Sequence, residues 1–205
     1  MEPESAESYY ARLAAATDAG GRLPLVTDGP LSWDVFPFEA ASLRLKPLEP
    51  LADVEPPRRG EDPAECWCAS PDGAHGEVWG NERWVLRLVE PSSLPLTLSL
   101  GPRAHHDLPG LTTELAAELG QLLVSVAAAM EALPSVGRAH VGKYGDGSAH
   151  LHVFLFGRPA RLPQLRGSPL QDWEACLPLT PGEVLRANAA YVAGRVAVDM
   201  GGRAA

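Results

Sequence analysis

The sequence predicts an α+β domain in which helices cover an antiparallel sheet, preceded by an irregular N-terminal extension. Strand-like segments occur in adjacent pairs on both sides of one long amphipathic helix, an order typical of antiparallel sheets. The Gly-rich phosphate loops of parallel nucleotide-binding folds are absent. Since 205 residues are few for two full domains, we expect an extension over residues 1–63 and one domain over residues 64–205.

The extension is predicted from its composition. A short helix is expected over residues 5–16, which stops before a Gly-Gly pair. Between Leu23 and Pro63, eight prolines exclude a long helix or a central strand. Residues 56–62, PPRRGED, are expected to form an exposed linker.

The strands are predicted from short apolar runs that end at turn residues. A Pro-Ser-Ser turn separates the first two runs, which we expect to pair antiparallel, and Gly80-Asn81 suits a turn before them. A Gly-Asp-Gly turn separates the other two runs, which predicts a β-hairpin. The four expected strands are residues 84–89, 94–100, 138–144 and 150–156.

Two helices are predicted in the domain. Apolar residues recur with helical spacing between Thr112 and Leu133, and Pro134 ends the pattern. Near the C-terminus, Thr180-Pro181-Gly182-Glu183 has the sequence of a capping box with proline at the first helical position. The helix that follows is expected to end at Gly201-Gly202.

Composition and charge exclude several classes of function. The net charge of −9 disfavours binding to polymeric nucleic acid, which requires a basic face. The sequence has an acidic start and no run of about 18 consecutive apolar residues, so we expect a soluble, cytoplasmic protein without a membrane partner. With three cysteines, two of them only one residue apart, a disulfide scaffold is excluded. The absence of Ile and the many Gly and Pro residues suggest a bacterial genome rich in GC.

The candidate chemistry lies in the second hairpin. His150 and His152 are expected on one face of a strand, with Phe154 as the third member of that face. Such a pair is able to serve as nucleophile and ligand, or simply as polar positions on a wet sheet face. Residues 138–166 carry a net charge of +4 in an otherwise acidic chain. Lys143 and Arg158 therefore suit a small phosphate ester, although single exposed arginines usually only solubilise a loop.

Several motifs, in the expected order, resemble the histidine triad (HIT) superfamily of nucleotidyl hydrolases and transferases. The stretch from Gly145 to Leu155, GDGSAHLHVFL, resembles its His-φ-His-φ-His signature. Cys66-Trp67-Cys68 resembles the start of the HIT domain, and residues 78–89 resemble its first hairpin. Gly101-Pro102-Arg103-Ala104-His105 resembles its Pro-x-x-His segment before the long helix. The resemblance covers residues 64–200 and implies a HIT-like fold.

The resemblance implies covalent catalysis. His152 matches the family's nucleophilic histidine, which attacks a nucleoside phosphate and forms a nucleotidyl-histidine intermediate. His150 would orient the site or bind metal, and Ser148 would contact the phosphate. Phe154 departs from the family, because a third histidine normally stands there. In an alternative register, His150 is the nucleophile and Ser148 occupies the first signature position.

The resemblance also implies structural zinc. In the galactose-1-phosphate uridylyltransferase branch, two cysteines and two histidines hold the ion. The matching residues here are Cys66, Cys68, His105 and His150, although Cys-x-Cys is tighter than the usual Cys-x-x-Cys. His106 is an alternative to His105, and the two cysteines are alternatively inert thiols.

The other candidate residues are expected to be structural. His75 and His140 are not expected to bind metal, and Cys176 is expected in the core. Trp67 is expected to be a core or edge aromatic, with a base pocket as the alternative.

The resemblance thus implies a nucleotidyl hydrolase or transferase that acts on a small nucleotide or nucleotide sugar, and it also implies a homodimer. The alternative function is a catalytically impaired HIT-fold protein that binds a nucleotide, or an interaction module stabilised by metal.

Overall fold

The computed structural model describes residues 11, 14–23, 38, 43, 47, 49–69, 75–175 and 177–205. The chain divides into two compact units, Met1–Pro56 and Pro57–Ala205. The second unit therefore begins seven residues before the expected domain. Most of the predicted helix over residues 5–16 lies outside the described residues, although residues 11, 14 and 15 are described and are helical. More than half of the proline-rich segment and Cys176 also lie outside them.

Pro57–Ala205 is an α+β unit built on a six-stranded sheet, which confirms the predicted fold class. The strand order is β4-β5-β3-β2-β1-β6, and every neighbouring pair is antiparallel. The strands are β1 (Glu77–Gly80), β2 (Trp84–Leu88), β3 (Thr97–Pro102), β4 (Val136–Gly142), β5 (Val153–Pro159) and β6 (Arg203–Ala204).

Both predicted strand pairs are present, with shifted ends. β2 pairs with β3 as expected, but β3 starts three residues later than the predicted strand and continues to Pro102. β4 pairs with β5, but ten residues connect them instead of a tight Gly-Asp-Gly turn. The prediction that His150 and His152 lie within the strand is therefore wrong, since β5 begins at Val153. β6 was not predicted; Gly202, with a φ of 78°, lets the chain turn back against β1 after the last helix.

The backbone of the long connection bonds to other segments, which explains why it does not form a hairpin. Arg59 forms an isolated β-bridge with Ser148, in which its N–H donates to the Gly147 carbonyl and its carbonyl accepts from Ala149. The N–H of Leu151 donates to the carbonyl of His106. The segment expected to be an exposed linker thus pairs at Arg59 with the loop that carries the two histidines.

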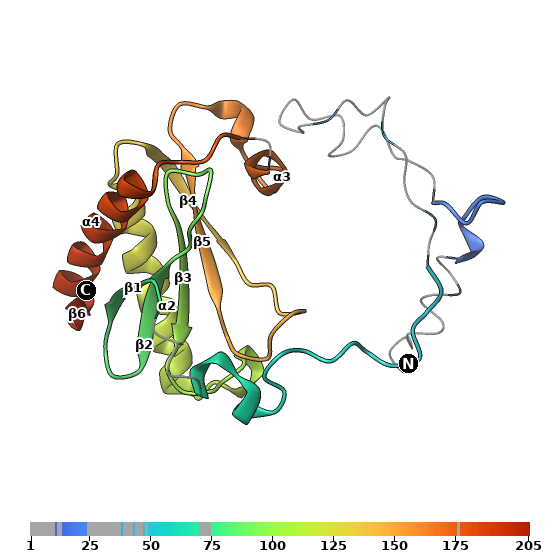
Figure 1. The fold of residues 1–205 in the computed structure, drawn as a ribbon, viewed down its shortest axis with the longest axis horizontal. Coiled ribbons are helices and arrows are strands. Elements are labelled where there is room, and N and C mark those ends of the chain that lie inside the picture. The colour runs from blue at the N-terminus through green and yellow to red at the C-terminus, as the bar shows by residue number, and fades with distance from the viewer. Residues whose placement is uncertain are drawn as a thin grey trace. The chain divides into compact units, whose positions relative to one another are not determined.

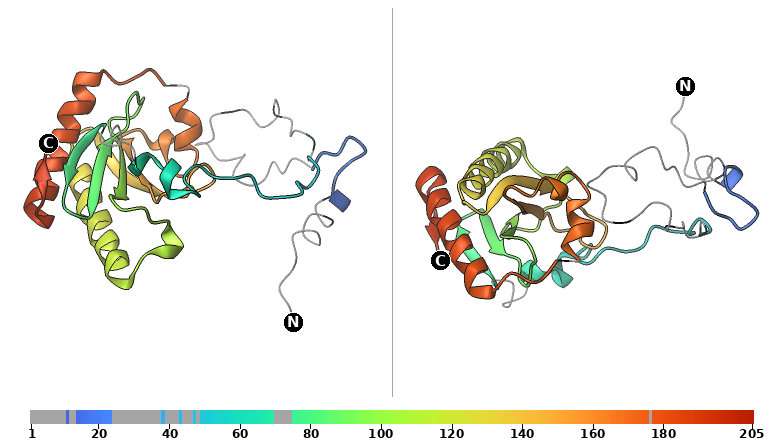
Figure 2. Two further views of the ribbon diagram at one scale, coloured as in Figure 1. Left: turned by 60° about the horizontal axis from the view of Figure 1, so that its bottom comes forward. Right: turned by 90° about the horizontal axis from the view of Figure 1, so that it is seen from above.

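Helices lie on both faces of the sheet (Figures 1 and 2). The long helices α2 (Thr113–Glu131) and α4 (Gly182–Met200) pack side by side on one face. The short helix α3 (Leu170–Glu174) and the 3-10 turn η7 (Pro163–Leu165) follow β5 and lie on the other face. The short 3-10 turns η3 (Pro63–Glu65), η4 (Trp67–Ala69) and η6 (Leu108–Gly110) lie before β1 and before α2.

Alternation along β5 divides the core in two. Val153 and Leu155 join the main core beneath α2 and α4. Phe156 belongs to a smaller cluster with Leu165 and Leu170 on the opposite face, and Phe154 packs against that cluster. This smaller cluster holds α3 against the same face of β5 as Phe154.

The helix starts differ in their capping. The Thr112 hydroxyl accepts from the N–H of Leu115 at the start of α2. The capping box predicted for α4 is wrong, because the Thr180 hydroxyl donates to the carbonyl of Leu94 and no side chain caps this helix. Pro181 is the N-cap residue instead of the first helical residue, and Gly201 ends α4 as predicted.

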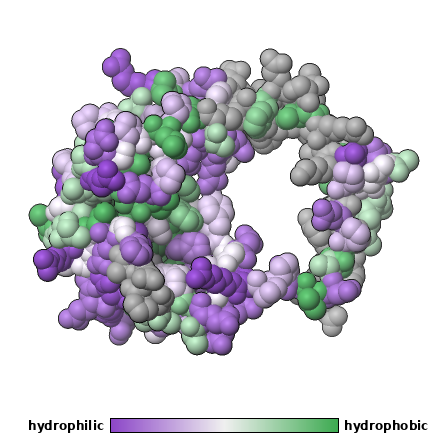
Figure 3. All heavy atoms as spheres, viewed as in Figure 1, coloured by the Kyte–Doolittle hydropathy of each residue, from purple (hydrophilic) through white to green (hydrophobic). Residues whose placement is uncertain are grey.

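Among the described residues, one helix, α2, is long and apolar enough by composition to cross a membrane. In the structure, one side of α2 is buried against α4 and the sheet, at residues such as Leu122 and Val126. A core helix passes the same compositional test. Strongly apolar residues form small patches among hydrophilic ones on the face of the domain shown in Figure 3.

Candidate active site and metal centre

His150 is held in a buried position just before β5. Its side chain is completely buried, and its Nε2 lies 2.8 Å from the carbonyl oxygen of Pro102. Because a carbonyl only accepts hydrogen bonds, Nε2 carries the proton of the neutral ring and Nδ1 keeps its lone pair. That Nδ1 lies 3.4 Å from Sγ of Cys66.

Three more groups surround this lone pair. Cys66 lies between η3 and η4, Cys68 lies within η4, and His105 lies between β3 and η6. Nδ1 of His105 lies 3.7 Å from Sγ of Cys68. The ligand atoms of Cys66, Cys68, His105 and His150 all lie within 4.8 Å of one another. The structure thus brings together the four residues named from the sequence as metal ligands.

Two glycines allow this close packing. Gly60 has a φ of 84°, and a Cβ at this position would lie 3.3 Å from Cβ of Cys66. A Cβ on Gly101 would lie 2.6 Å from the carbonyl oxygen of Leu151. The chain at Gly60 and the loop before β5 therefore approach the cluster more closely than residues with side chains would allow.

The donor set fits zinc. Two sulfur and two imidazole ligands are typical of tetrahedral structural zinc. With Zn–S of about 2.3 Å and Zn–N of about 2.0 Å, tetrahedral angles place sulfur and nitrogen about 3.5 Å apart. The distances of 3.4 and 3.7 Å between sulfur and nitrogen are close to this value. The bond from His150 to Pro102 also matches the outer hydrogen bond that metal-binding histidines make.

The pKa values of the cluster favour its uncharged forms. Burial raises the pKa of the Cys68 thiol to about 11, and the neighbouring Cys66 adds to the effect. Burial lowers the pKa of His150 more than the bond to Pro102 raises it, and the nearby His105, Arg87 and His152 lower it further. A divalent cation would have to displace the thiol protons, as zinc does when it binds cysteine.

His152 is oriented by the backbone of the other histidine. Its Nδ1 lies 2.9 Å from the carbonyl oxygen of His150, so Nδ1 is the donor in this bond. In the neutral ring, Nε2 then carries the lone pair. The side chain is only partly buried, in contrast to His150. The two imidazoles therefore differ in role. Both ring nitrogens of His150 are engaged, whereas His152, among the described residues, hydrogen-bonds through Nδ1 alone.

Phe154 continues the same face along β5. Its ring lies 5.3 Å from the His152 ring, edge to face, and 5.8 Å from the Phe156 ring, stacked. The ring of Tyr144, from the loop after β4, lies 6.5 Å away. An apolar aromatic shelf, defined here as Tyr144, Phe154 and Phe156, thus adjoins His152 where the family signature has a third histidine.

The three predicted phosphate ligands are not all close together. The Ser148 hydroxyl accepts from the N–H of His150, and Lys143 lies in the same loop, 3.5 Å from Asp107. Arg158 stands near the far end of β5, five residues from Val153 and therefore about 17 Å along the strand. There it bonds to the carbonyl of Pro159. The structure places Ser148 and Lys143 in the loop that carries the histidines and Arg158 away from that loop.

One ion-pair network was missed by the sequence analysis. Arg58 donates to Asp107 at 2.8 Å, and Lys143 approaches the other carboxylate oxygen. Burial opposes ionisation of Asp107, but bonds from Arg58 and from the N–H of Leu108, with the charge of Lys143, lower its pKa overall. No sequence pattern links these residues, since 49 positions separate Arg58 from Asp107.

The remaining candidates take other positions. The ring centres of Trp67 and His150 lie 4.4 Å apart. The Arg87 guanidinium lies 4.3 Å from the centre of the Trp67 ring. His106 contributes its carbonyl to the loop through Leu151. His75 is exposed, and His140 lies on β4 outside the cluster.

The chain is thus an α+β protein in which an oriented, partly exposed histidine adjoins a Cys₂His₂ cluster. No known protein family and no curated protein matches the sequence. Its structure is similar to those of a HIT-like protein from Bartonella henselae (16% identity, TM-score 0.45) and a histidine triad protein from Sinorhizobium meliloti (20%, 0.47). It covers 85% and 87% of those chains, and the alignments cover 58% of this one.

Two further solved structures are similar to this one. A Zn-bound histidine triad protein from Mycobacterium smegmatis is 13% identical, with a TM-score of 0.47 over 64% of this chain and 92% of that one. A uridylyltransferase mutant is 20% identical, with a TM-score of 0.42 over 63% of this chain and 46% of that one. The resemblance stated from the sequence is to the histidine triad superfamily, which is also the name that the first three of these structures carry. Because identities and TM-scores are low, function is inferred from this chain's own residues.

Proposed function

We propose that this protein is a nucleotidyl hydrolase or transferase that acts on a nucleoside phosphate derivative through a covalent intermediate on His152. The observation that carries the proposal is the bond from Nδ1 of His152 to the carbonyl oxygen of His150. It orients the ring and leaves the lone pair on Nε2, the state that a nucleophilic imidazole needs.

The reaction requires only groups that the chain and its substrate supply. Nε2 of His152 attacks the α-phosphorus, an N–P bond forms, and the P–O bond to the leaving group breaks with its electron pair on the departing oxygen. Nδ1–H remains bonded to the His150 carbonyl, which stabilises the positive charge that develops on the ring. Water or an acceptor hydroxyl then attacks phosphorus, a new O–P bond forms, and the N–P bond breaks with its electron pair returning to Nε2. The proton of the attacking group passes to solvent, and solvent protonates the first departing oxygen.

Ser148 and Lys143 are the proposed phosphate ligands near His152. The hydroxyl and the ammonium would both donate to phosphate oxygens, and the ammonium would offset their charge. Arg158 is retained only as a contact to a more distant part of a substrate, since it stands near the far end of β5. A small nucleotide or nucleotide sugar fits this arrangement better than a polymer.

We propose that Cys66, Cys68, His105 and His150 hold a structural zinc ion. Zinc bound there would supply a closed, redox-inert crosslink between η4, the segment after β3 and the loop before β5. His150 then positions His152 in two ways, because its ring is anchored in the cluster and its carbonyl oxygen accepts from His152.

The binding-module alternative rests on Phe154. This side chain has no hydrogen-bonding group and packs against the apolar cluster under α3, so it supplies no phosphate contact. A protein of this kind would bind a nucleotide at the same loop without turnover. Assembly as a homodimer, expected from the resemblance, is compatible with either function and is measured by sedimentation.

Intact-mass spectrometry after incubation with nucleotide sugars and dinucleotides tests the proposal. The wild-type protein should gain the mass of one nucleotidyl group. His152→Asn should show no adduct and should lose more than about 10³-fold in turnover, because the attacking lone pair is missing. His150→Ala keeps the backbone carbonyl and should retain some adduct.

The outcomes separate three hypotheses. An adduct that survives in His152→Asn and disappears in His150→Ala would make His150 the nucleophile, as in the alternative register. Nucleotide binding without any adduct in the wild type would favour the binding module. The buried position of His150, with both ring nitrogens engaged, supports the first assignment over the alternative register.

A further inference from the structure

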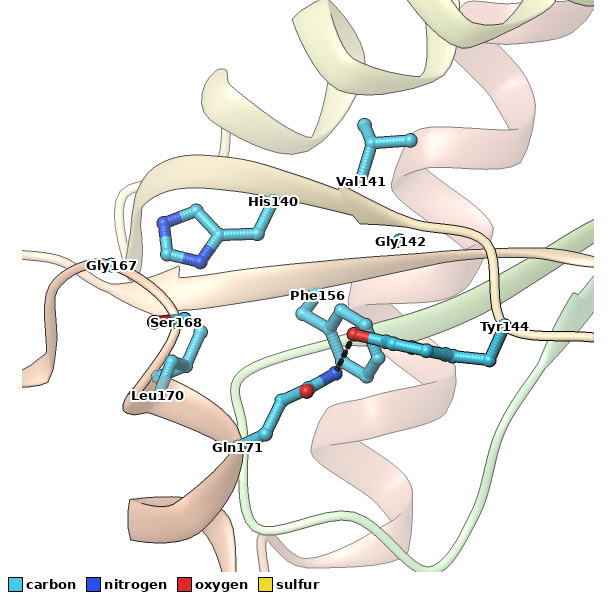
Figure 4. Close-up of a pocket in the computed structure, with 9 residues that line it drawn as sticks. All are labelled: His140, Val141, Gly142, Tyr144, Phe156, Gly167, Ser168, Leu170 and Gln171. Carbon is cyan, nitrogen blue, oxygen red and sulfur yellow. Dashed lines mark hydrogen bonds between the residues drawn. The ribbon is translucent and has the colours of Figure 1, made fainter. Parts of the chain in front are cut away.

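A pocket of about 400 Å³ opens beside the aromatic shelf, between β4 and the segment that leads into α3 (Figure 4). Neither His152 nor the Cys₂His₂ cluster lines it. The residues that line it are His140, Val141, Gly142, Tyr144, Phe156, Gly167, Ser168, Leu170 and Gln171. Its volume lies in the range of pockets that bind small molecules.

The pocket carries no formal charge. Its lining contains no acidic residue, lysine or arginine. Burial lowers the pKa of His140, and the positive charge of Arg158 lowers it further, so both effects favour the neutral imidazole. The lining itself offers a phosphate group no charged partner, and an uncharged group would lose less hydration free energy on entering.

Three polar groups at the pocket wall offer both kinds of hydrogen bond. Nε2 of Gln171 donates to the Tyr144 hydroxyl at 2.6 Å, as the dashed line in Figure 4 shows. This bond leaves the Tyr144 O–H as a donor and Oε1 of Gln171 as an acceptor. Neutral His140 supplies one further donor and one acceptor.

Aromatic rings form two sides of the pocket. Phe156 is buried at its floor, and Tyr144 extends across the opening toward Gln171 (Figure 4). Phe154 contacts both rings and also contacts His152. The pocket and His152, which lies just before β5, are therefore neighbours separated by the Phe154 side chain.

We propose that this pocket binds a nucleobase of the substrate, with Gln171 and Tyr144 as the residues that determine base specificity. A nucleobase is neutral and planar, it stacks on aromatic rings, and its edge presents donors and acceptors together. A hexose would instead present hydroxyls on a non-planar ring, and the lining holds no carboxylate to receive them. The position of the phosphate at His152 rests on the proposed function, but base binding in the pocket does not.

Free nucleosides test the proposal, because they carry the base without the phosphate. The full chain, labelled with ¹⁵N-histidine, is titrated with adenosine, guanosine, cytidine and uridine while the His140 ring signals are followed by NMR. At least one nucleoside should shift these signals saturably. Gln171→Ala and Tyr144→Phe should each weaken that binding about tenfold, because each removes a hydrogen-bonding group from the wall.

The matched control is Gln164→Ala. Gln164 is an exposed glutamine in η7 that does not line the pocket, so its variant should bind like the wild type. Saturable shifts from methyl galactoside, with none from nucleosides, would overturn the choice of a base. Absence of any nucleoside response at His140, or a response unaffected by Gln171→Ala and Tyr144→Phe, would overturn the pocket assignment.

The two proposals fail in different ways. Nucleoside binding at His140 without a nucleotidyl adduct would retain the pocket and remove the covalent mechanism. An adduct on His152 without any nucleoside response at His140 would retain the mechanism and place the base elsewhere.

Discussion

Single backbone carbonyls assign different roles to two histidines that are only two residues apart. The Pro102 carbonyl accepts a hydrogen bond from Nε2–H of His150, and the His150 carbonyl accepts one from Nδ1–H of His152. One ring therefore presents Nδ1 to a buried sulfur, and the other leaves Nε2 for chemistry. Both assignments follow from the rule that a carbonyl only accepts.

His140 should make the stability of the protein depend on pH. Its pKa in the folded protein is lowered by burial and by Arg158, whereas in the unfolded chain it is about 6.5. As the pH falls below about 6.5, the unfolded chain takes up a proton that the folded protein resists, so this contribution to stability is lost.

The measurement is urea unfolding at pH 7.5 and pH 5.5. The free energy of unfolding should fall more between these pH values in the wild type than in His140→Gln, which does not titrate. His150 is present in both proteins and its effect is subtracted in the comparison. An equal fall in both proteins would contradict the prediction.

At the scale of elements, the cluster joins three segments that have little regular structure of their own. η4 has three residues, and His105 and His150 lie outside helices and strands. Short 3-10 turns gain little stability from their own hydrogen bonds. A metal ion that binds only the folded arrangement would stabilise all three segments together.

We predict that protein purified without chelator carries about one zinc ion per chain. Chelation should lower its melting temperature, and Cys66→Ser should prevent stoichiometric binding, because thiolate is a much better zinc ligand than a hydroxyl. Elemental analysis and thermal unfolding measure the two effects. Zinc-free protein that is equally stable with and without chelator would remove the metal proposal and leave that of His152 intact.

Two neighbouring histidines provide the matched comparison. His105→Ala should lose zinc, since Nδ1 of His105 lies against Cys68. His106→Ala should keep it, because His106 contributes only its backbone carbonyl in the described contacts. The reverse result would identify His106 as the ligand.

At the scale of the whole molecule, the second compact unit includes residues before its first regular element. The strap, defined as residues 57–60, bonds through Arg58 to Asp107 and through Arg59 to the loop before β5. The backbone that supports the histidines therefore depends on residues that lie about 90 positions earlier in the sequence.

Two truncations should show this dependence. A chain that starts at residue 57 should unfold with the same free energy as the corresponding unit of the full protein. A chain that starts at residue 64 loses two backbone hydrogen bonds between Arg59 and the loop, each worth about 1 kcal/mol. It should be less stable in urea unfolding and should form less adduct, and equal behaviour of the two truncations would contradict the role of the strap.

Local patterns in the sequence were sufficient to predict most of the helices and strands of the domain. The helical spacing between Thr112 and Leu133 predicts α2, since each apolar residue on one helix face must be buried. Short apolar runs likewise predict β2 to β5, although their ends shifted by up to three residues. These features depend on neighbours in sequence, and such neighbours remain neighbours in the fold.

Only the tertiary structure decided how the site is assembled. Sequence resemblance named the four cluster residues and His152, but hydrogen bonds to distant carbonyls determine which ring nitrogen keeps its lone pair. The ten-residue connection before β5 follows from pairing with Arg59 and His106, and the pocket follows from packing of α3 against β4 and β5. Contacts between segments far apart in the chain leave no periodic pattern, because each partner satisfies only its own local geometry.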